Sequence, residues 1–221
     1  MCIRDRNKEA INKIVSEKYD LMITVDCGIS GIEEIDYANS LGLDVIVTDH
    51  HEPGDEIPKA IAVIDNKRED STYPFRELAG VGVAFKLCQA LGMRLGLKEE
   101  SYLKYLDIVC VGTISDIVPL VDENRVITKL GLLLVKQTKN LGLRAIINSS
   151  GYTKIDSNTI SFGVAPRINA CGRMGEAEEA LELLLSKNIN EVNELTKKLN
   201  ERNKTRQEIE KQKEQPFPSY D

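Results

Sequence analysis

Apolar positions follow two different spacings along the first 65 residues of this chain. Short runs of apolar, often β-branched residues alternate with stretches whose apolar residues recur every three or four positions. The first spacing favours buried strands and the second favours helices. We therefore predict strands at Leu21–Val25, Val45–Val47 and Ala60–Ile64, and helices near residues 7–18 and 31–41. Strands joined by helices or short links are typical of a parallel sheet with right-handed crossovers.

The rest of the chain predicts helices after a polar loop over residues 66–78. The expected helices cover residues 78–92, 101–118, 122–137, 143–149, 176–186 and 188–214. The last of these is long and charged with a thin apolar stripe, which is typical of a helix that bridges between domains. The predicted fold is therefore α/β: a parallel sheet with flanking helices, followed by a helical region and a long connecting helix.

The length and the apolar fraction predict either one large domain or one domain plus an appendage. The chain has 221 residues, of which 42% are hydrophobic, and this is enough for a core. We expect the main domain to cover residues 7–186 and the connecting helix to cover residues 187–214. Residues 1–6 and 215–221 lack periodicity, so we expect both ends to be non-native.

Charge and cysteine content narrow the class of protein. The net charge is −6, there is no Trp, and aromatic residues make up 5%. These values argue against a module that holds nucleic acid by charge or base stacking alone, but they allow carboxylates that bind divalent cations. The five cysteines are scattered without a C-x-x-C pair, which is typical of reduced thiols in a cytoplasmic protein. No apolar run is long enough for a membrane span, and no membrane association is expected.

Candidate chemistry gathers where the predicted strands end. Asp49, His50 and His51 follow the second strand, and the two histidines are the only ones in the chain. Asp26 and Asp65 follow the first and third strands. In open α/β sheets, ligands bind at the carboxyl edge of parallel strands, so these side chains are expected to share one edge. The alternative is an exposed, solvated loop.

A further carboxylate, Asp116, is flanked by apolar residues, and we expect it to be largely buried. A buried charge is costly unless it is paired or binds a metal. The alternative is that Asp116 caps a helix together with Ser115.

Carboxylates combined with imidazoles suit Mn²⁺ and related divalent ions. Two such ions can activate a water and hold an attacked phosphorus atom. We expect Asp26 to bridge two ions and His50 to bind one. His51 is expected to donate to a phosphate oxygen, while Asp49 orients a histidine.

A second candidate site is the stretch from Ala165 to Gly175, which combines Pro, two Gly, Asn and two Arg and is expected to be a loop. Arg167 and Arg173 beside glycines can place a guanidinium group and backbone N–H groups on a phosphate. A solvated loop without a ligand is the alternative.

Four motifs in this order resemble the DHH phosphoesterase superfamily: V-D-C-G at 25–28, V-T-D-H-H at 47–51, G-T-I-S-D-I-V-P-L at 112–120, and A-P-R-I-N-A-C-G-R-M at 165–174. The order and the last two motifs are similar to its RecJ branch, the single-strand-specific exonucleases. The resemblance covers roughly residues 15–210 and makes residues 7–186 the DHH catalytic domain.

The resemblance implies a reaction and roles for particular residues. It implies 5′-to-3′ removal of nucleotides from single-stranded DNA with two Mn²⁺ or Mg²⁺ ions. Asp26, His50 and Asp116 would be metal ligands, whereas Asp49 and His51 would support them or contact phosphate.

The resemblance also implies contacts with substrate and partners. Asn169 and Arg173, with Arg167 beside them, would lie in the substrate groove. Single-stranded DNA is the expected partner, and single-strand-binding protein and a RecQ-type helicase are further expected partners.

The chain departs from the family's pattern in two ways. The family's first motif, Asp-x-Asp-Ala-Asp-Gly, and its smaller second domain, rich in glycine and basic residues, are not found. We therefore expect a fragment that is weak or inactive as a nuclease by itself. Two other functions stay open: a phosphatase of oligoribonucleotides or cyclic dinucleotides, and a non-catalytic scaffold in replication.

Overall fold

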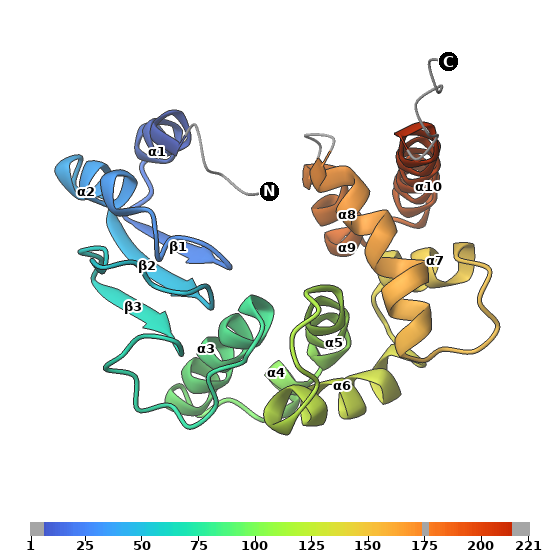
Figure 1. Cartoon of the computed structure of the whole chain (residues 1–221), viewed down its shortest axis with the longest axis horizontal. Helices are drawn as coiled ribbons and strands as arrows, with labels where there is room; N and C mark the ends of the chain where they lie inside the picture. The colour runs from blue at the N-terminus through green and yellow to red at the C-terminus, as the bar shows by residue number, and fades with distance from the viewer. Residues whose placement is uncertain (1–6, 174–176, 214–221) are drawn as a thin grey trace, which may run out of the picture. The chain divides into compact units, whose positions relative to one another are not determined.

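The computed structural model describes residues 7–173 and 177–213 (Figure 1). The chain divides into two compact units, residues 2–131 and residues 132–221. The boundary lies inside helix α6 (Asp122–Val135). The assignment of residues 7–186 to one catalytic domain stays a prediction.

The first unit contains a sheet of three parallel strands in the order β1-β2-β3. The strands are β1 (Leu21–Val25), β2 (Asp44–Asp49) and β3 (Ala62–Asp65), with Ile23 opposite Ile46 and Thr48 opposite Ile64. This confirms the predicted parallel sheet. The third strand begins two residues later than predicted, because the N–H group of Ala60 bonds to Pro58 O in a turn.

Helices flank this sheet, as the sequence predicted. Helices α1 (Asn7–Ser16) and α2 (Ile32–Ser40) cover one face, and α3 (Gly80–Arg94) contacts β1 and β2 near the carboxyl ends of the strands (Figure 1). Under α1 and α2 lies an apolar core made of Ile11, Ile35, Ala38, Leu43, Val45 and Val47. Such burial of apolar surface is the main favourable term in folding, and it holds the strands in a fixed register.

The predicted single helix over residues 101–118 is wrong, because the structure has two. Helix α4 (Glu100–Leu103) ends in a tight turn in which Tyr105 N–H bonds to Tyr102 O. Helix α5 (Leu106–Ser115) then ends before Ile117, whose φ of 60° is left-handed and cannot continue a right-handed helix.

The second unit consists of helices. After α7 (Leu141–Ser149) come a π-helix η1 (Thr159–Val164), α8 (Ala165–Arg173), α9 (Ala177–Leu185) and α10 (Ile189–Lys213). Helix α10 packs against α7, α8 and α9. The most deeply buried large side chains of this unit include Leu143, Ile146, Ile160, Leu183 and Leu199.

The predicted loop from Ala165 to Gly175 is wrong over residues 165–173, which form α8. Pro166 is the second residue of α8, which continues directly from η1 through the bond of Ala165 N–H to Ile160 O, and its ring nitrogen donates no N–H group at this junction. Ala170 and Cys171 are then fully buried, which anchors the helix in the unit. Residues 174–176 lie outside the described residues.

The long charged helix predicted over residues 188–214 is confirmed as α10. Its apolar residues Val192, Leu195 and Leu199 are buried against its neighbours, so the thin stripe is a packing face. Within residues 7–173 and 177–213, no helix is both long and apolar enough to cross a bilayer.

Candidate metal centre

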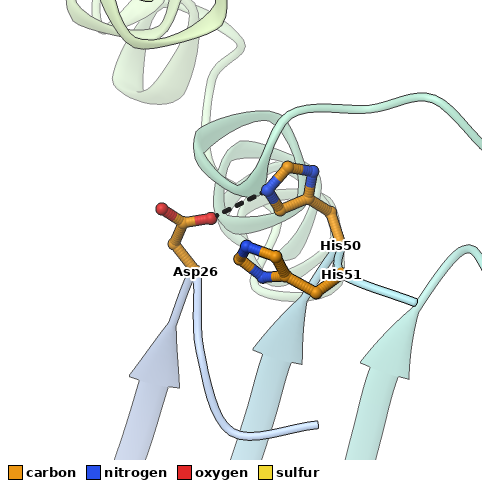
Figure 2. Close-up of side chains that lie close together, drawn as sticks. All are labelled: Asp26, His50 and His51. Atoms are coloured by element: carbon orange, nitrogen blue, oxygen red, sulfur yellow. Dashed lines mark ion pairs between the residues drawn. The ribbon is translucent and has the colours of Figure 1, made fainter. Parts of the chain in front are cut away.

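Asp26 lies in a constrained turn directly after β1. Its φ of 62° is left-handed, and Gly28 follows with a φ of 113° that only glycine adopts readily. The N–H group of Asp26 bonds to Thr48 O at 3.0 Å, and Thr24 Oγ1 bonds to Cys27 O at 2.6 Å. These bonds hold the turn against β2, so that the Asp26 carboxylate projects beyond the strand ends (Figure 2).

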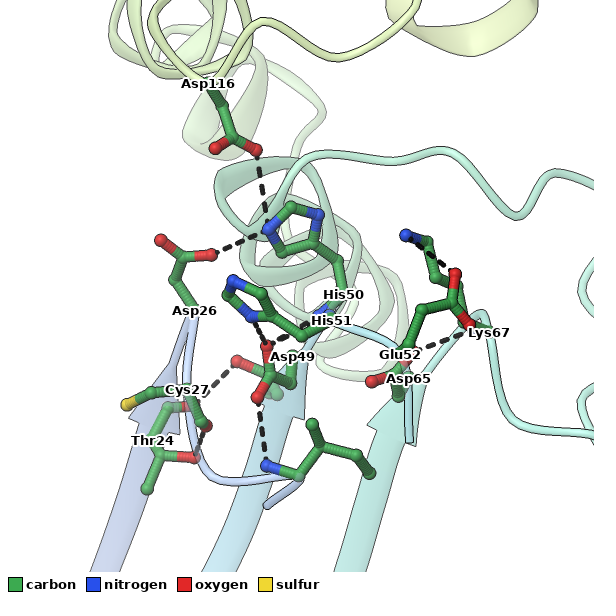
Figure 3. A network of polar contacts seen from close by, with 12 residues as sticks. Thr24, Asp26, Cys27, Asp49, His50, His51, Glu52, Asp65, Lys67 and Asp116 are labelled. Carbon is green, nitrogen blue, oxygen red and sulfur yellow. Dashed lines mark hydrogen bonds and ion pairs between the residues drawn. The ribbon is translucent and has the colours of Figure 1, made fainter. Parts of the chain in front are cut away.

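His50 faces two carboxylates. Its Nε2 atom lies 3.0 Å from Asp26 Oδ1 and 3.4 Å from Asp116 Oδ2 (Figure 3). The Asp26 carboxylate, with help from Asp116, raises the pKa of His50 against the opposing effect of burial. Nε2 is buried, yet it makes no hydrogen bond of acceptable geometry within the described part of the chain. A buried ring nitrogen that faces two carboxylates without a hydrogen bond is suited to bind a cation.

Asp116 is more exposed than the sequence predicted. It is the C-cap of α5, and 37% of its side chain is exposed. The expectation of burial took the apolar neighbours as a sign of a core position. However, Ile117 is itself 89% exposed, so these neighbours do not enclose the carboxylate.

Asp49 is buried beneath the two histidines and accepts four hydrogen bonds (Figure 3). Its Oδ2 accepts from Ile29 N at 2.9 Å, while Oδ1 accepts from the N–H groups of His50 (2.8 Å) and His51 (3.3 Å) and from His51 Nδ1 (2.7 Å). Burial by itself would raise the pKa of Asp49, but these bonds outweigh it and the net shift is downward. An ionised Asp49 can only accept, so His51 carries its proton on Nδ1.

That hydrogen bond sets the orientation of His51. With Nδ1 bonded to Asp49, the remaining ring nitrogen, Nε2, is available, and 57% of the side chain is exposed. The His51 ring lies beside that of His50, with centroids 4.6 Å apart. The expected role of Asp49 as an orienting residue therefore has a geometric basis in His51, and the role itself stays a prediction.

Asp26, His50 and His51 meet the geometric requirement for a shared cation. Each offers one ligand atom, and these atoms lie within 4.8 Å of one another. Carboxylate and imidazole ligands suit Mn²⁺ and similar ions. Sequence reasoning gave His51 a supporting or phosphate-contacting role and did not count it among the metal ligands, although its adjacency to His50 was a signal for its place in this cluster.

The prediction that carboxylates gather at one edge of the sheet is confirmed, but their side chains point in different directions. Asp65 at the end of β3 is buried, and burial raises its pKa. Its Oδ1 accepts from Lys67 N–H at 2.8 Å, and Lys67 Nζ pairs with Glu52 at 3.2 Å. Of the three strand-end carboxylates, Asp26 is the one that faces Nε2 of the His50 ring, whereas Asp49 accepts from the backbone N–H group of His50.

The three predicted substrate residues lie on α8 in the second unit. Arg167 donates from Nε to Asn200 Oδ1 at 2.6 Å and from Nη1 to Gly163 O at 2.5 Å, and burial lowers its pKa. These bonds fasten α8 to α10 and η1. Asn169 is exposed, and the side chain of Arg173 lies outside what the structure describes. Their roles toward substrate stay predictions.

Comparison with known sequences gives matches along most of the chain. A sequence model described as the DHH family, N-terminal domain, matches residues 2–113. The single-stranded-DNA-specific exonuclease RecJ of Bacillus subtilis (strain 168) is 47% identical over 206 residues, which cover 92% of this chain and 25% of that protein. The RecJ of Escherichia coli (strain K12) is 37% identical over 216 residues, covering 91% of this chain and 37% of that protein.

Solved structures give the same result. The crystal structure of RecJ in complex with Mn²⁺ from Thermus thermophilus matches with a TM-score of 0.82 and 39% identity, over 92% of this chain and 30% of that one. A crystal structure of exonuclease RecJ bound to manganese matches with a TM-score of 0.82 and 40% identity, over 92% of this chain and 51% of that one. The chain thus spans a quarter to about a half of the relatives it matches, and it belongs to the DHH family.

Proposed function

We propose that this chain carries the catalytic centre of a metal-dependent phosphodiesterase, a RecJ-like exonuclease that removes nucleotides from single-stranded DNA in the 5′-to-3′ direction. The observation that carries the proposal is the buried His50 Nε2 atom, which faces the carboxylates of Asp26 and Asp116. The names of the matched relatives support the substrate class.

The cofactor in this proposal is Mn²⁺ or Mg²⁺. Asp26, His50 and Asp116 would hold it, and His51 offers a further ligand atom. A cation bound there supplies a Lewis acid that polarises a phosphoryl oxygen and lowers the pKa of a water. Bound manganese in two related RecJ structures supports this choice.

The chain's own groups have distinct tasks in this proposal. The ionised Asp49 holds the proton of His51 on Nδ1, which fixes the ring and turns Nε2 outward. When His51 is protonated, Nε2 can donate to a phosphate oxygen. Asp49 is 1% exposed, so it acts through His51 and does not touch the substrate itself.

Asn169 and Arg173 on α8 are proposed contacts to the sugar–phosphate backbone, since a non-specific exonuclease must accept every base. Arg167 is a third proposed contact to the backbone, through the N–H groups that its two intramolecular bonds do not use. Replacing Arg173 with Ala should weaken DNA binding by the same factor for all sequences. It should also reduce the slope of the logarithm of the binding constant against the logarithm of the salt concentration by about one unit. An unchanged slope would remove Arg173 from the interface.

We further propose single-strand-binding protein and a RecQ-type helicase as partners, by resemblance to the family. A cytoplasmic location is proposed with them. The free thiols of Cys27, Cys88, Cys110 and Cys171 among the described residues agree with a reducing compartment.

The metal site is tested by electron paramagnetic resonance of Mn²⁺ with purified residues 1–221. Free Mn²⁺ loses its sharp signal on binding, so the signal reports affinity directly. Asp26→Asn and His50→Ala should each weaken binding, whereas Asp55→Asn, an equal charge change on an exposed loop, should not. Mn²⁺ affinity that is the same in all four proteins would contradict the proposed site.

The reaction is tested by release of mononucleotides from 5′-phosphorylated single-stranded DNA in Mn²⁺. Release, however slow, that is lost in Asp26→Asn while DNA affinity is kept would support the proposal, because the carboxylate holds metal and not DNA. Mn²⁺-dependent turnover of a short oligoribonucleotide without any release from DNA would overturn the exonuclease function and favour the phosphatase alternative.

A further inference from the structure

Helix α3 begins directly against the side chain of Asp26. The first residue of α3 is Gly80, which is buried. A Cβ atom placed on Gly80 would lie 2.6 Å from Cγ and 2.8 Å from Cβ of Asp26, and it would overlap Oδ1. Oδ1 is the same atom that lies 3.0 Å from His50 Nε2. The position of the Asp26 carboxylate is therefore compatible with glycine at residue 80 and with no larger residue.

The backbone of Asp26 cannot easily yield to such a contact. Its left-handed φ and the bond from its N–H group to Thr48 O fix where the Cα–Cβ bond points. The side chain, in contrast, is 56% exposed, so rotation about χ1 into solvent is open to it. Rotation about χ1 would remove the overlaps with Oδ1 and Cγ by turning the carboxylate away from His50. The 2.8 Å contact with Asp26 Cβ, which χ1 does not move, would be relieved by a small shift of the backbone.

We propose that Gly80 is a positioning residue for the metal centre: the absence of its side chain leaves the space in which the Asp26 carboxylate faces His50. The geometry gives Gly80 a different task from Gly82, two residues further along. A Cβ on Gly82 would meet only the side chain of Leu78, at 3.3 Å, where a flexible leucine can adjust.

The inference rests on the proposed metal site, and the first measurement separates the two. Wild-type residues 1–221 are titrated with Mn²⁺ by electron paramagnetic resonance, with Asp26→Asn beside it. If wild type and Asp26→Asn bind alike, the metal site fails and the inference fails with it. If Asp26→Asn binds more weakly, the Mn²⁺ affinities of Gly80→Ala and Gly82→Ala are compared with those of wild type and Asp26→Asn.

Gly80→Ala should weaken Mn²⁺ binding by about 10- to 100-fold, the range seen when residues that orient a metal ligand are replaced. Gly82→Ala should bind as wild type does. In the metal-free protein, the ¹⁵N shift of His50 Nε2 should move in Gly80→Ala as it does in Asp26→Asn, because both variants remove the same carboxylate from that atom. Mn²⁺ affinity and a His50 signal equal to those of wild type would overturn the proposal.

A purely structural role for Gly80 is separated by thermal melting in the absence of metal. The melting temperature of Gly80→Ala should fall by no more than about 2–4 °C, because the carboxylate rotates away and the contact with Asp26 Cβ is left for the backbone to absorb. In an Asp26→Gly background, Gly80→Ala should lower the melting temperature less than it does in the wild-type background, since the three atoms nearest to its methyl group are gone. An equal, large drop in melting temperature in both backgrounds would make Gly80 a packing residue of α3 and would overturn the proposal.

Discussion

Replacing Asp49 with Asn tests whether the carboxylate beneath the two histidines organises the site. The change keeps the shape of the side chain and removes its charge. One Asn oxygen can replace Oδ1, but the amide NH₂ group then faces the buried N–H group of Ile29, which loses its acceptor. A buried donor left without a partner costs about 1–3 kcal/mol.

The remaining bonds to His50 and His51 would also weaken in Asp49→Asn. A charged acceptor makes hydrogen bonds roughly twice as strong as a neutral one does. Adding this loss to that of the Ile29 bond, we expect unfolding free energy to fall by about 2–4 kcal/mol at pH 7. This is a large share of the roughly 5–15 kcal/mol that stabilises an ordinary domain.

The pH dependence of the unfolding free energy shows whether the charge of Asp49 stabilises the fold. The folded-state pKa of Asp49 is lowered, so its contribution is present above the unfolded value of about 3.9 and is lost as pH falls through the folded-state pKa. Below that pH, a protonated Asp49 resembles Asn. The difference in stability between wild type and Asp49→Asn should therefore be constant from pH 7 to about pH 5 and narrow below about pH 4.

Urea unfolding of the metal-free chain at pH 7, 5 and 3 measures this difference. Asp55→Asn serves as the control, since Asp55 is exposed, and it should change stability by less than about 0.5 kcal/mol. A loss below about 1 kcal/mol in Asp49→Asn, or a loss that does not narrow toward pH 3, would refute the reasoning.

Three further predictions follow from contacts elsewhere in the structure. Because Asp26 raises the pKa of His50, their contact should stabilise the metal-free chain below about pH 6.5, and this contribution should be lost as pH rises through the folded-state pKa of His50. Urea unfolding in EDTA should show a smaller pH effect in Asp26→Asn than in wild type, because Asp116 still raises the pKa of His50 in the variant. Arg167→Ala should lower unfolding free energy by about 2 kcal/mol through loss of the two bonds that hold α8, with Arg167→Lys failing to rescue it in the same measurement. Gly142→Ala should cost about 1–3 kcal/mol by thermal melting, because its Cβ would lie 2.6 Å from the backbone carbon of Leu183, which cannot rotate away.

Local patterns in the sequence were enough to predict the parallel sheet and the edge of the sheet on which the candidate site lies. Short apolar runs followed by acidic residues mark the ends of β1, β2 and β3, and a parallel arrangement brings such ends together whatever the helices between them do. The Asp-His-His sequence and the three other motifs similarly indicate the DHH family by themselves. These features depend on residues close together in the chain.

What the tertiary structure decided is the direction of each side chain. Asp26, Asp49 and Asp65 all occupy strand ends, yet Asp26 faces His50 because its backbone is left-handed, whereas Asp49 turns inward toward the N–H group of Ile29. Likewise, the sequence around Asp116 indicated burial, and the turn at Ile117 leaves it exposed. The role of Gly80 depends on a contact between residues 54 positions apart, and local periodicity carries no information about contacts at that separation.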